Sequence, residues 1–304
     1  MEKLAILLCS TTNQIFAVGN VLIGLKKHFS LPEEEYDIIL YVDKDMNIKD
    51  ENALKKIYKN IIIKHFNYKN ETLEKSAILK TFTNMSYARF EALSLLNEYK
   101  QVIYFDTDIL IQKDIISLTK MNEKNIYGFI NKDMTLEIQF INKHLIKNYD
   151  TNKYNLNTYE INSGVIVFNN NIHNPEEIKE WCYIKRGEWE AADQPILNLA
   201  LQEFNISFED FTESYNKVYP CNNYTNYHIL HSITSEKFWE LKNPNEWNEN
   251  NNQWISLGGT NYYKTKYKRK KDMIYNITWL IPFKKLRYYI KNKLNDIFNI
   301  RYGG

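Results

Sequence analysis

Two carboxylates, Asp106 and Asp108, stand inside one of the most apolar stretches of this 304-residue chain, QVIYFDTDILI at residues 101–111. An unpaired buried carboxylate costs several kcal/mol, so two side by side need a shared counter-charge. Side chains two residues apart on a strand point the same way, so both carboxylates could reach one divalent cation. The alternative is an acid pair that caps the turn after a strand, and the motif alone leaves both interpretations open.

The surrounding pattern indicates an α/β fold. Short runs rich in Ile, Leu and Val alternate with segments of helical spacing, which favours a mostly parallel sheet built from βαβ units. Ligands of such sheets collect at the carboxyl ends of strands, where Asp106 and Asp108 would lie. The expected strands are residues 4–9, 36–42, 60–66, 101 onward, 126–130 and 164–168, and the expected helical segments are residues 16–28, 51–58, 74–97 and one that starts at Asn174-Pro175.

Five blocks, in order along the chain, resemble the family-8 retaining glycosyltransferases, the group that contains glycogenin and bacterial lipopolysaccharide galactosyl- and glucosyltransferases. The last of them, HSITSEKFW at residues 231–239, keeps the family's spacing from His to Lys to Trp, but Thr234 and Phe238 replace its glycine and proline. The resemblance covers residues 4–240 and implies a GT-A-type domain with a nucleotide-sugar donor, most often UDP-linked. The other four blocks are SYAR at 86–89, YFDTDIL at 104–110, INSGVIVFN at 161–169 and ADQPILN at 192–198.

The resemblance implies a divalent metal beside the donor diphosphate. Asp106 and Asp108 match the family's metal-binding pair and His231 its third protein ligand, a set that suits Mn²⁺, with Mg²⁺ as the alternative. Lys237 matches the residue that contacts the diphosphate, so the metal and the lysine together would neutralise the leaving group. Taken without the resemblance, His231 would more commonly be a half-buried loop residue.

The resemblance also assigns residues to the donor. Arg89, two residues after Tyr87, matches a donor-contacting arginine, whereas the usual role of such an arginine is a surface ion pair. Asn162 precedes an expected strand, where its amide could bind sugar hydroxyls or cap a turn. Asp193 would hold the donor sugar or act as a helix N-cap. The implied donor site comprises Thr11, Thr12, Asn13, Tyr87, Arg89, Asp106, Thr107, Asp108, Asn162, Ser163, Gly164, Asp193, Gln194 and Lys237.

Asp193 and Gln194 form the implied catalytic pair, with Gln194 against the β face of the anomeric carbon. Retaining hydrolases use a carboxylate nucleophile, and glutamine is a poor one. We therefore favour front-face attack through an oxocarbenium-like state, in which the leaving phosphate takes the acceptor's proton. The family commonly has an acid after its first strand that touches the uracil ring; the segment here, residues 10–13, is Ser-Thr-Thr-Asn, which can hydrogen-bond a base but lacks that acid.

Charge divides the chain into two parts. The formal net charge is +2, but residues 260–304 carry 12 Lys or Arg against two acids, a net of +10, and the rest carries −8. We expect residues 1–245 to form the catalytic domain and residues 246–304 a linker and a basic, aromatic C-terminal segment, with residues 245–253 a solvated loop. The segment could pack on the acidic body or bind an anionic membrane that holds a lipid-linked acceptor. No nucleic-acid module is recognisable, so no nucleic-acid partner is expected.

Cysteine usage and hydropathy bear on location. Cys9, Cys182 and Cys221 are scattered, which fits a reducing compartment. No apolar run approaches the roughly 20 residues of a membrane span. We expect a cytoplasmic protein that binds the inner face of the cytoplasmic membrane peripherally, if at all.

The predicted function is retaining transfer of a hexose from a UDP-sugar to a glycan acceptor, such as lipopolysaccharide, lipooligosaccharide or another surface glycan. A haloacid-dehalogenase-type phosphatase also places D-x-D after an apolar strand, but that fold prefers Thr or Val where this chain has Leu110. A non-catalytic nucleotide-sugar-binding homologue is the other alternative. Release of UDP from a donor would separate these possibilities.

Overall fold

A computed structural model describes residues 3–66, 84–139, 153–189, 191–233, 237–240, 245–262 and 266–297. Its central sheet contains β1 (Leu4–Ser10), β2 (Tyr36–Val42), β3 (Ile62–His65), β4 (Gln101–Phe105), β6 (Ile126–Thr135), β7 (Tyr159–Asn169) and β8 (Phe208–Asp210), in the order β3-β2-β1-β4-β7-β6-β8. A second sheet, in the order β5-β10-β9, contains β5 (Ile109–Ile111), β9 (Lys217–Val218) and β10 (Ile229–His231). The first four central strands pair in parallel, and β7 runs antiparallel to β4 and β6. The predicted mostly parallel sheet is confirmed.

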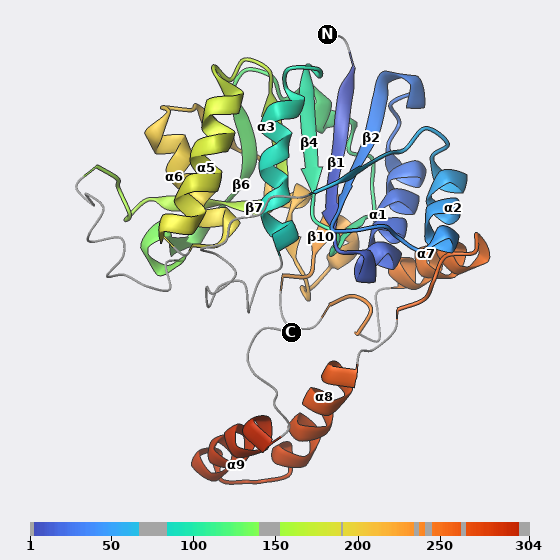
Figure 1. The fold of residues 1–304 in the computed structure, drawn as a ribbon, viewed down its shortest axis with the longest axis vertical. Coiled ribbons are helices and arrows are strands. Elements are labelled where there is room, and N and C mark those ends of the chain that lie inside the picture. Colours follow the sequence, from blue (N-terminus) through green and yellow to red (C-terminus); the bar gives the residue numbers. More distant parts are fainter. Residues whose placement is uncertain are drawn as a thin grey trace.

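Helices cover both faces of the central sheet (Figure 1). One face carries α1 (Ile15–His28) and α2 (Ile48–Ile57), with α7 (Asn245–Ser256) packed against α1. The other face carries the 3-10 helix η3 (Asn84–Phe90), α3 (Glu91–Leu95), α5 (Pro175–Trp189) and α6 (Asp193–Glu203). The helix expected to start at Asn174-Pro175 is confirmed as α5.

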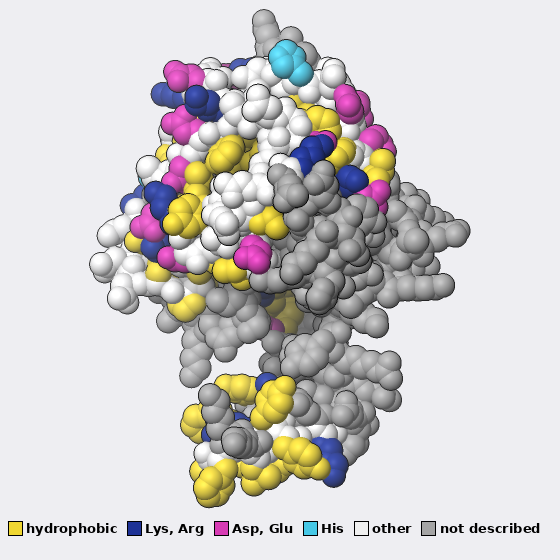
Figure 2. Space-filling model, turned by 90° about the vertical axis from the view of Figure 1, so that its left-hand side faces the viewer, with side chains coloured by type: hydrophobic (Ala, Val, Ile, Leu, Met, Phe, Trp, Pro, Cys, Tyr) yellow, Lys and Arg dark blue, Asp and Glu magenta, His cyan; other side chains and the backbone are white. Residues whose placement is uncertain are grey.

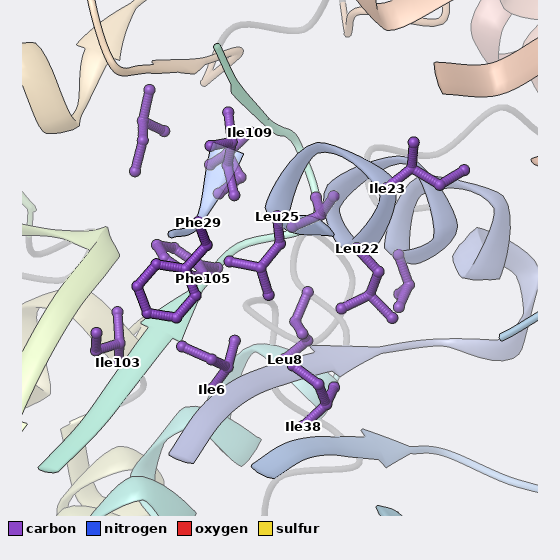
Figure 3. Close-up of a cluster of buried hydrophobic side chains, with 14 of the residues drawn as sticks. Ile6, Leu8, Leu22, Ile23, Leu25, Phe29, Ile38, Ile103, Phe105 and Ile109 are labelled. Atoms are coloured by element: carbon purple, nitrogen blue, oxygen red, sulfur yellow. The ribbon is translucent and has the colours of Figure 1, made fainter. Parts of the chain in front are cut away.

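Alternation along β1 explains how one strand serves both faces. Ile6 and Leu8 pack into the cluster that contains Leu22 of α1 (Figure 3), whereas Ala5 and Leu7 belong to the cluster on the α3 side. Every residue of β1 is therefore buried. The strand ends at the point where the functional side chains collect.

Three local expectations are corrected by the structure. Asp106 and Asp108 do not share a strand, because β4 ends at Phe105 and β5 begins in the second sheet. Asn162 lies inside β7 rather than before it, because β7 continues its pairing with β6 as far as Tyr159. Where the description resumes at residue 84, the expected long helix is a 3-10 helix followed by the five residues of α3, and residues 74–83 lie outside the described part.

The expected loop at residues 245–253 is instead most of α7, so that expectation is wrong. Trp247 and Trp254, seven residues apart on one helical face, are buried against the domain. A Cβ on Gly19 of α1 would meet the Trp254 ring at 2.2 Å, so this contact needs glycine. The asparagines between Trp247 and Trp254 made this segment look like a polar loop, so the apolar face of the helix was not recognised. The division at residue 245 stays a prediction, and this packing favours a boundary after α7.

The C-terminal segment contains α8 (Lys266–Trp279) and α9 (Lys284–Ile297), which pack on each other as a hairpin. In Figure 1 the hairpin, drawn in orange and red, extends away from the sheet. Among the described residues, no helix has the length and apolar character needed to cross a membrane.

Candidate active site

A cavity of about 480 Å³ lies at the carboxyl ends of β1 and β4. Its walls come from the loop after β1, η3, the turn between β4 and β5, β7, the start of α6 and the segment after β10. The structure thus brings together the three predicted metal ligands and both members of the predicted catalytic pair. Predicted residues that line the cavity are Thr11, Arg89, Asp106, Thr107, Asp108, Asn162, Ser163, Gly164, Asp193, Gln194, His231 and Lys237.

Asp106, Asp108 and His231 each offer a ligand atom within 4.8 Å of those of the other two. Nε2 of His231 lies 3.2 Å from Oδ1 of Asp108 and 3.6 Å from Oδ2 of Asp106. Adjacent ligands of an octahedral ion with bonds of about 2.1 Å are roughly 3 Å apart, so these atoms fit one small divalent cation. Two carboxylates and one imidazole are compatible with Mn²⁺ or Mg²⁺.

Strand pairing sets the position of these ligands. The backbone N–H of Asp106 donates to the carbonyl of Gly164 at 2.8 Å, and the carbonyl of Asp108 accepts from the backbone N–H of Ser232 at 2.9 Å. The imidazole of His231 then lies directly on Gly164, where a Cβ would be only 2.0 Å from Cε1. Gly164 was predicted as a donor-site residue, and the structure shows that any side chain there would displace His231.

A hydrogen-bond chain determines which nitrogen of His231 carries the proton. Oδ1 of Asn162 accepts from the backbone N–H of Gly164 at 3.0 Å, so the side-chain nitrogen of Asn216 must donate to that same oxygen, at 2.8 Å. The side-chain oxygen Oδ1 of Asn216 then faces Nδ1 of His231 at 2.8 Å and accepts a hydrogen bond from the Nδ1–H group. When the imidazole is neutral, Nε2 is therefore left with a lone pair that faces the two carboxylates, as a metal-binding histidine requires.

Replacing Asn216 with leucine should weaken Mn²⁺ binding by about 10–100-fold, because His231 loses the partner that fixes its tautomer and ring orientation. Titration calorimetry with Mn²⁺ measures the affinity. Asn222→Ala is the matched control, since Asn222 is an exposed asparagine six residues farther along the chain, between β9 and β10. Wild-type affinity in Asn216→Leu would show that another contact holds the histidine.

Arg89 is the buried cation of the site. It is only 5% exposed; Nη2 lies 3.0 Å from Oδ1 of Asp106, and Nε lies 3.0 Å from Oδ2 of Asp193. Burial favours the neutral guanidine, but Asp106 and Asp193 outweigh it and raise the pKa of Arg89. Burial also raises the pKa of Asp193, against the opposing pull of Arg89. The alternative of a surface ion pair is therefore wrong.

Lys237 lines the cavity beside the metal ligands. Its Nζ donates to Oδ2 of Asp108 at 2.5 Å and to the carbonyl of Ser232 at 2.7 Å. Burial alone would raise the pKa of Asp108, but the positive charges of His231 in its protonated form and of Lys237 hold it well below its ordinary value. Phe238, which replaces the family's proline, is buried in the core, and Thr234 lies outside the described residues.

Asp193 and Gln194 begin α6, but Asp193 is not the N-cap. Ala192 holds that position, and no side chain caps the helix. The oxygen of Gln194 accepts from the backbone N–H of Ser163 at 2.9 Å and from Asn162 Nδ2 at 3.3 Å. The Ser163 hydroxyl lies 3.2 Å from this oxygen and 3.2 Å from Oδ2 of Asp193, and its one proton can serve either acceptor. These donors fix the orientation of the Gln194 amide.

Three predicted donor residues do not line the cavity. Tyr87 is fully buried, and its hydroxyl donates to the carbonyl of Ala191, so it supports the start of α6. Thr12 and Asn13 belong to a 3-10 turn whose third residue, Gln14, lines the cavity instead.

Sequence analysis missed the remaining lining residues. Spacing could have found Tyr104, which lies two residues before Asp106 and donates to it at 2.5 Å. Ser86, Ala192, Pro195, Ile233 and Trp239 belonged to matched blocks, and Ser10 to the segment after the first strand, but none had an assigned role. Cys9, Gln14, Met85 and Gln139 lacked a local signal. The missed residues are Cys9, Ser10, Gln14, Met85, Ser86, Tyr104, Gln139, Ala192, Pro195, Ile233 and Trp239.

The chain is similar to known proteins in sequence and in fold. The family model of glycosyl transferase family 8 matches residues 5–243. Similar solved structures include the bifunctional glycosyltransferase WbbM in its apo form, at 14% identity and a TM-score of 0.59, and the galactosyltransferase LgtC in complex with donor and acceptor sugar analogs, at 14% and 0.57. A third is the glycosyltransferase GlyE of Streptococcus pneumoniae TIGR4, at 16% and 0.53. No curated protein sequence matches this chain.

The structural matches cover 88%, 87% and 86% of this chain, and 51%, 99% and 66% of WbbM, LgtC and GlyE respectively. This chain therefore spans about half the length of WbbM. At such low identities the likeness shows the fold alone. The predicted GT-A-type fold is confirmed.

Proposed function

Because this chain belongs to glycosyl transferase family 8 and is a glycosyltransferase, we propose that it moves a hexose from a UDP-sugar to a glycan acceptor, with retention and with Mn²⁺. The observation that carries the proposal is the single cavity in which Asp106, Asp108 and His231 meet beside Lys237 and the Asp193–Gln194 pair. GT-A glycosyltransferases use such a cavity for a nucleotide-sugar donor and a glycan acceptor. The match to glycosyl transferase family 8 weighs against the alternative of a haloacid-dehalogenase-type phosphatase.

Asp106, Asp108 and His231 would hold the ion, which when bound supplies positive charge to the departing diphosphate. Lys237 adds a second positive charge at the same place, since its Nζ already lies against Asp108. Asp193 is held by Arg89 and by the Ser163 hydroxyl, at 3.2 Å, which leaves its carboxylate oriented toward the cavity to accept sugar hydroxyls. The site therefore combines charge neutralisation with fixed donors and acceptors.

The contacts of Gln194 favour front-face attack. Its oxygen, the atom that would have to attack the anomeric carbon, already accepts from the backbone N–H of Ser163 and from Nδ2 of Asn162, which engages both of its lone pairs. A nucleophile needs a free lone pair directed at the reacting carbon. We therefore infer that the acceptor hydroxyl attacks from the side the diphosphate leaves and passes its proton to the leaving phosphate oxygen.

A panel of nucleotide sugars tests the proposed function. UDP-glucose, UDP-galactose and UDP-N-acetylglucosamine, with GDP- and CMP-sugars as base controls, are incubated with Mn²⁺, with Mg²⁺ or with EDTA, and nucleotide release is measured. We expect UDP release that needs the metal. Binding of UDP-sugars without release would favour a non-catalytic homologue. Nucleotide release from GDP- or CMP-sugars would show that the enzyme prefers a base other than uracil. Such a preference is compatible with residues 10–13, which lack the acid that touches uracil in the family.

We also propose that the α8–α9 hairpin binds an anionic membrane, which would bring the cytoplasmic enzyme to a lipid-linked acceptor of surface-glycan synthesis. Figure 2 shows hydrophobic side chains gathered on the hairpin at the bottom of the molecule. They lie beside basic residues, a combination suited to an anionic interface. The exposed hydrophobic side chains are Met273, Tyr275, Ile277, Trp279, Leu280, Phe283, Leu286, Tyr288 and Tyr289.

Deleting residues 265–304 should abolish co-sedimentation with vesicles that contain anionic phosphatidylglycerol. Binding by the full chain should need the anionic lipid and fall as salt rises, because each basic residue near the surface contributes about 1 kcal/mol. Trp279→Ser combined with Phe283→Ser keeps the charge and should weaken binding less than the deletion. No binding by the full chain at any salt would favour packing of the hairpin on the acidic body.

A further inference from the structure

A buried carboxylate, Glu160, lies behind the cavity wall and was missed by sequence analysis. It is 1% exposed and sits on β7, two residues before Asn162. Its Oε1 accepts from Nε2 of Gln194 at 2.7 Å and from Nε2 of Gln139 at 2.8 Å. Both glutamines line the cavity, whereas Glu160 does not. One carboxylate oxygen therefore joins two walls that are 55 residues apart in the chain.

The orientation of Gln194 makes this contact obligatory. Its oxygen is taken by the backbone N–H of Ser163, so its Nε2 must find an acceptor, and Oε1 of Glu160 is that acceptor. The same carboxylate oxygen satisfies Gln139. Within the described residues, the hydrogen bonds continue from His231 through Asn216, Asn162, Gln194 and Glu160 to Gln139. Gln139 is the end of this path farthest from the metal ligands along the chain of hydrogen bonds.

Glu160 is an unfavourable residue for the fold. Oε2 is buried and has no hydrogen-bond partner in the described part of the chain. Burial raises the pKa of Glu160 to about 7, although both glutamine amides oppose the shift. A buried group that destabilises the native state and contacts an active-site residue is the pattern expected when function retains it.

We propose that Glu160 is a positioning residue for sugar transfer, which holds the amides of Gln139 and Gln194 as one unit in the cavity wall. This inference rests on the proposed function for its kinetic consequence. It does not make Glu160 a catalytic residue, because no substrate atom touches it. Its effect passes through the two amides.

Glu160→Leu should lower kcat by about 10–100-fold and change the donor KM by less than about 3-fold, since positioning affects the transition state more than donor binding. Glu160→Gln should restore most of kcat, because its carbonyl oxygen can accept the same two N–H groups. In a Gln194→Ala background, Glu160→Leu should cost less than about 2-fold more. Additive losses would overturn the proposal, and so would wild-type kcat in Glu160→Leu.

A second measurement needs no turnover. The side-chain amide signals of Gln139 and Gln194 are assigned in ¹⁵N-labelled protein by their disappearance in Gln139→Ala and Gln194→Ala. Both signals should shift in Glu160→Leu and shift much less in Glu160→Gln. If Glu160→Leu fails to fold, Gln139→Leu should move the Gln194 signal and lower kcat at unchanged donor KM. If the wild type releases no nucleotide, the proposed function fails, while unmoved amide signals would independently overturn the positioning role.

Discussion

Asp108→Asn should lower metal-dependent sugar transfer by at least about 1,000-fold, equivalent to roughly 4 kcal/mol in the barrier. The substitution removes the carboxylate that faces both His231, at 3.2 Å, and Lys237, at 2.5 Å. A neutral amide cannot replace a charged ligand, and its N–H groups would face the cation. Asp106→Asn should act in the same direction. Initial rates of nucleotide release at saturating donor, with Mn²⁺ titrated, measure the effect.

The matched control is Asp45→Asn, because the Asp45 side chain is 95% exposed and does not line the cavity. Circular dichroism and the urea midpoint of each variant should establish that the fold is retained. Asp108→Asn and Asp106→Asn both turning over near the wild-type rate would contradict the metal assignment. Recovery of Asp108→Asn at high Mn²⁺ would instead mean that the residue contributes affinity alone.

Arg89→Met should lower the free energy of unfolding at pH 7 by about 3–5 kcal/mol and abolish transfer. Arg89 is the buried partner of both Asp106 and Asp193, and it also donates to the carbonyl of Ser163 at 2.6 Å. Without it, two carboxylates remain in a buried site with no compensating charge. Urea unfolding monitored by fluorescence measures the loss.

The loss should depend on pH with a definite sign. Burial already raises the pKa of Asp193 in the folded protein while Arg89 opposes it, so removal of Arg89 should raise that pKa further. Protonation of Asp193 then stabilises the folded state. This stabilisation is complete below the pKa of Asp193 in the unfolded chain, about 3.9, and is lost as the pH rises through its pKa in the folded protein. The difference between variant and wild type should therefore shrink from pH 7 to pH 5. Arg89→Lys keeps the charge, so its free energy of unfolding should lie between those of Arg89→Met and the wild type. If the stability lost in Arg89→Met does not depend on pH, packing alone explains it.

Local patterns in the sequence were enough for the sheet and for much of the site. The alternating apolar runs identified strands because burial on both faces of a parallel strand demands continuous apolar residues. Asn174-Pro175 identified a helix start because capping depends on neighbouring residues. The Asp106–Asp108 motif was placed correctly at a strand end, although the two acids turned out to bridge two sheets rather than occupy one strand.

The residues that tertiary structure alone revealed act through contacts between distant segments. Asn216 and His231 are 15 residues apart, Glu160 and Gln194 are 34 apart, and no spacing rule links either pair. Asparagine is abundant throughout the chain, so composition could not single out Asn216 or detect the tryptophan stripe of α7. The role of Gly164 was equally hidden, because the histidine that excludes a side chain there comes from another strand.

By itself the sequence indicated which side chains could bind a cation and a diphosphate. The position of Asp106 and Asp108 at a strand end pointed to a cation because strand ends are encoded in short stretches of chain, and the family resemblance added His231 and Lys237. Only the tertiary structure decided their protonation and orientation. Whether His231 presents a lone pair at Nε2, and whether Gln194 has a free oxygen, depends on donors and acceptors supplied by β7, α6 and the segment before β9. Hydrogen-bond direction is a property of the assembled network, in which each partner constrains the next.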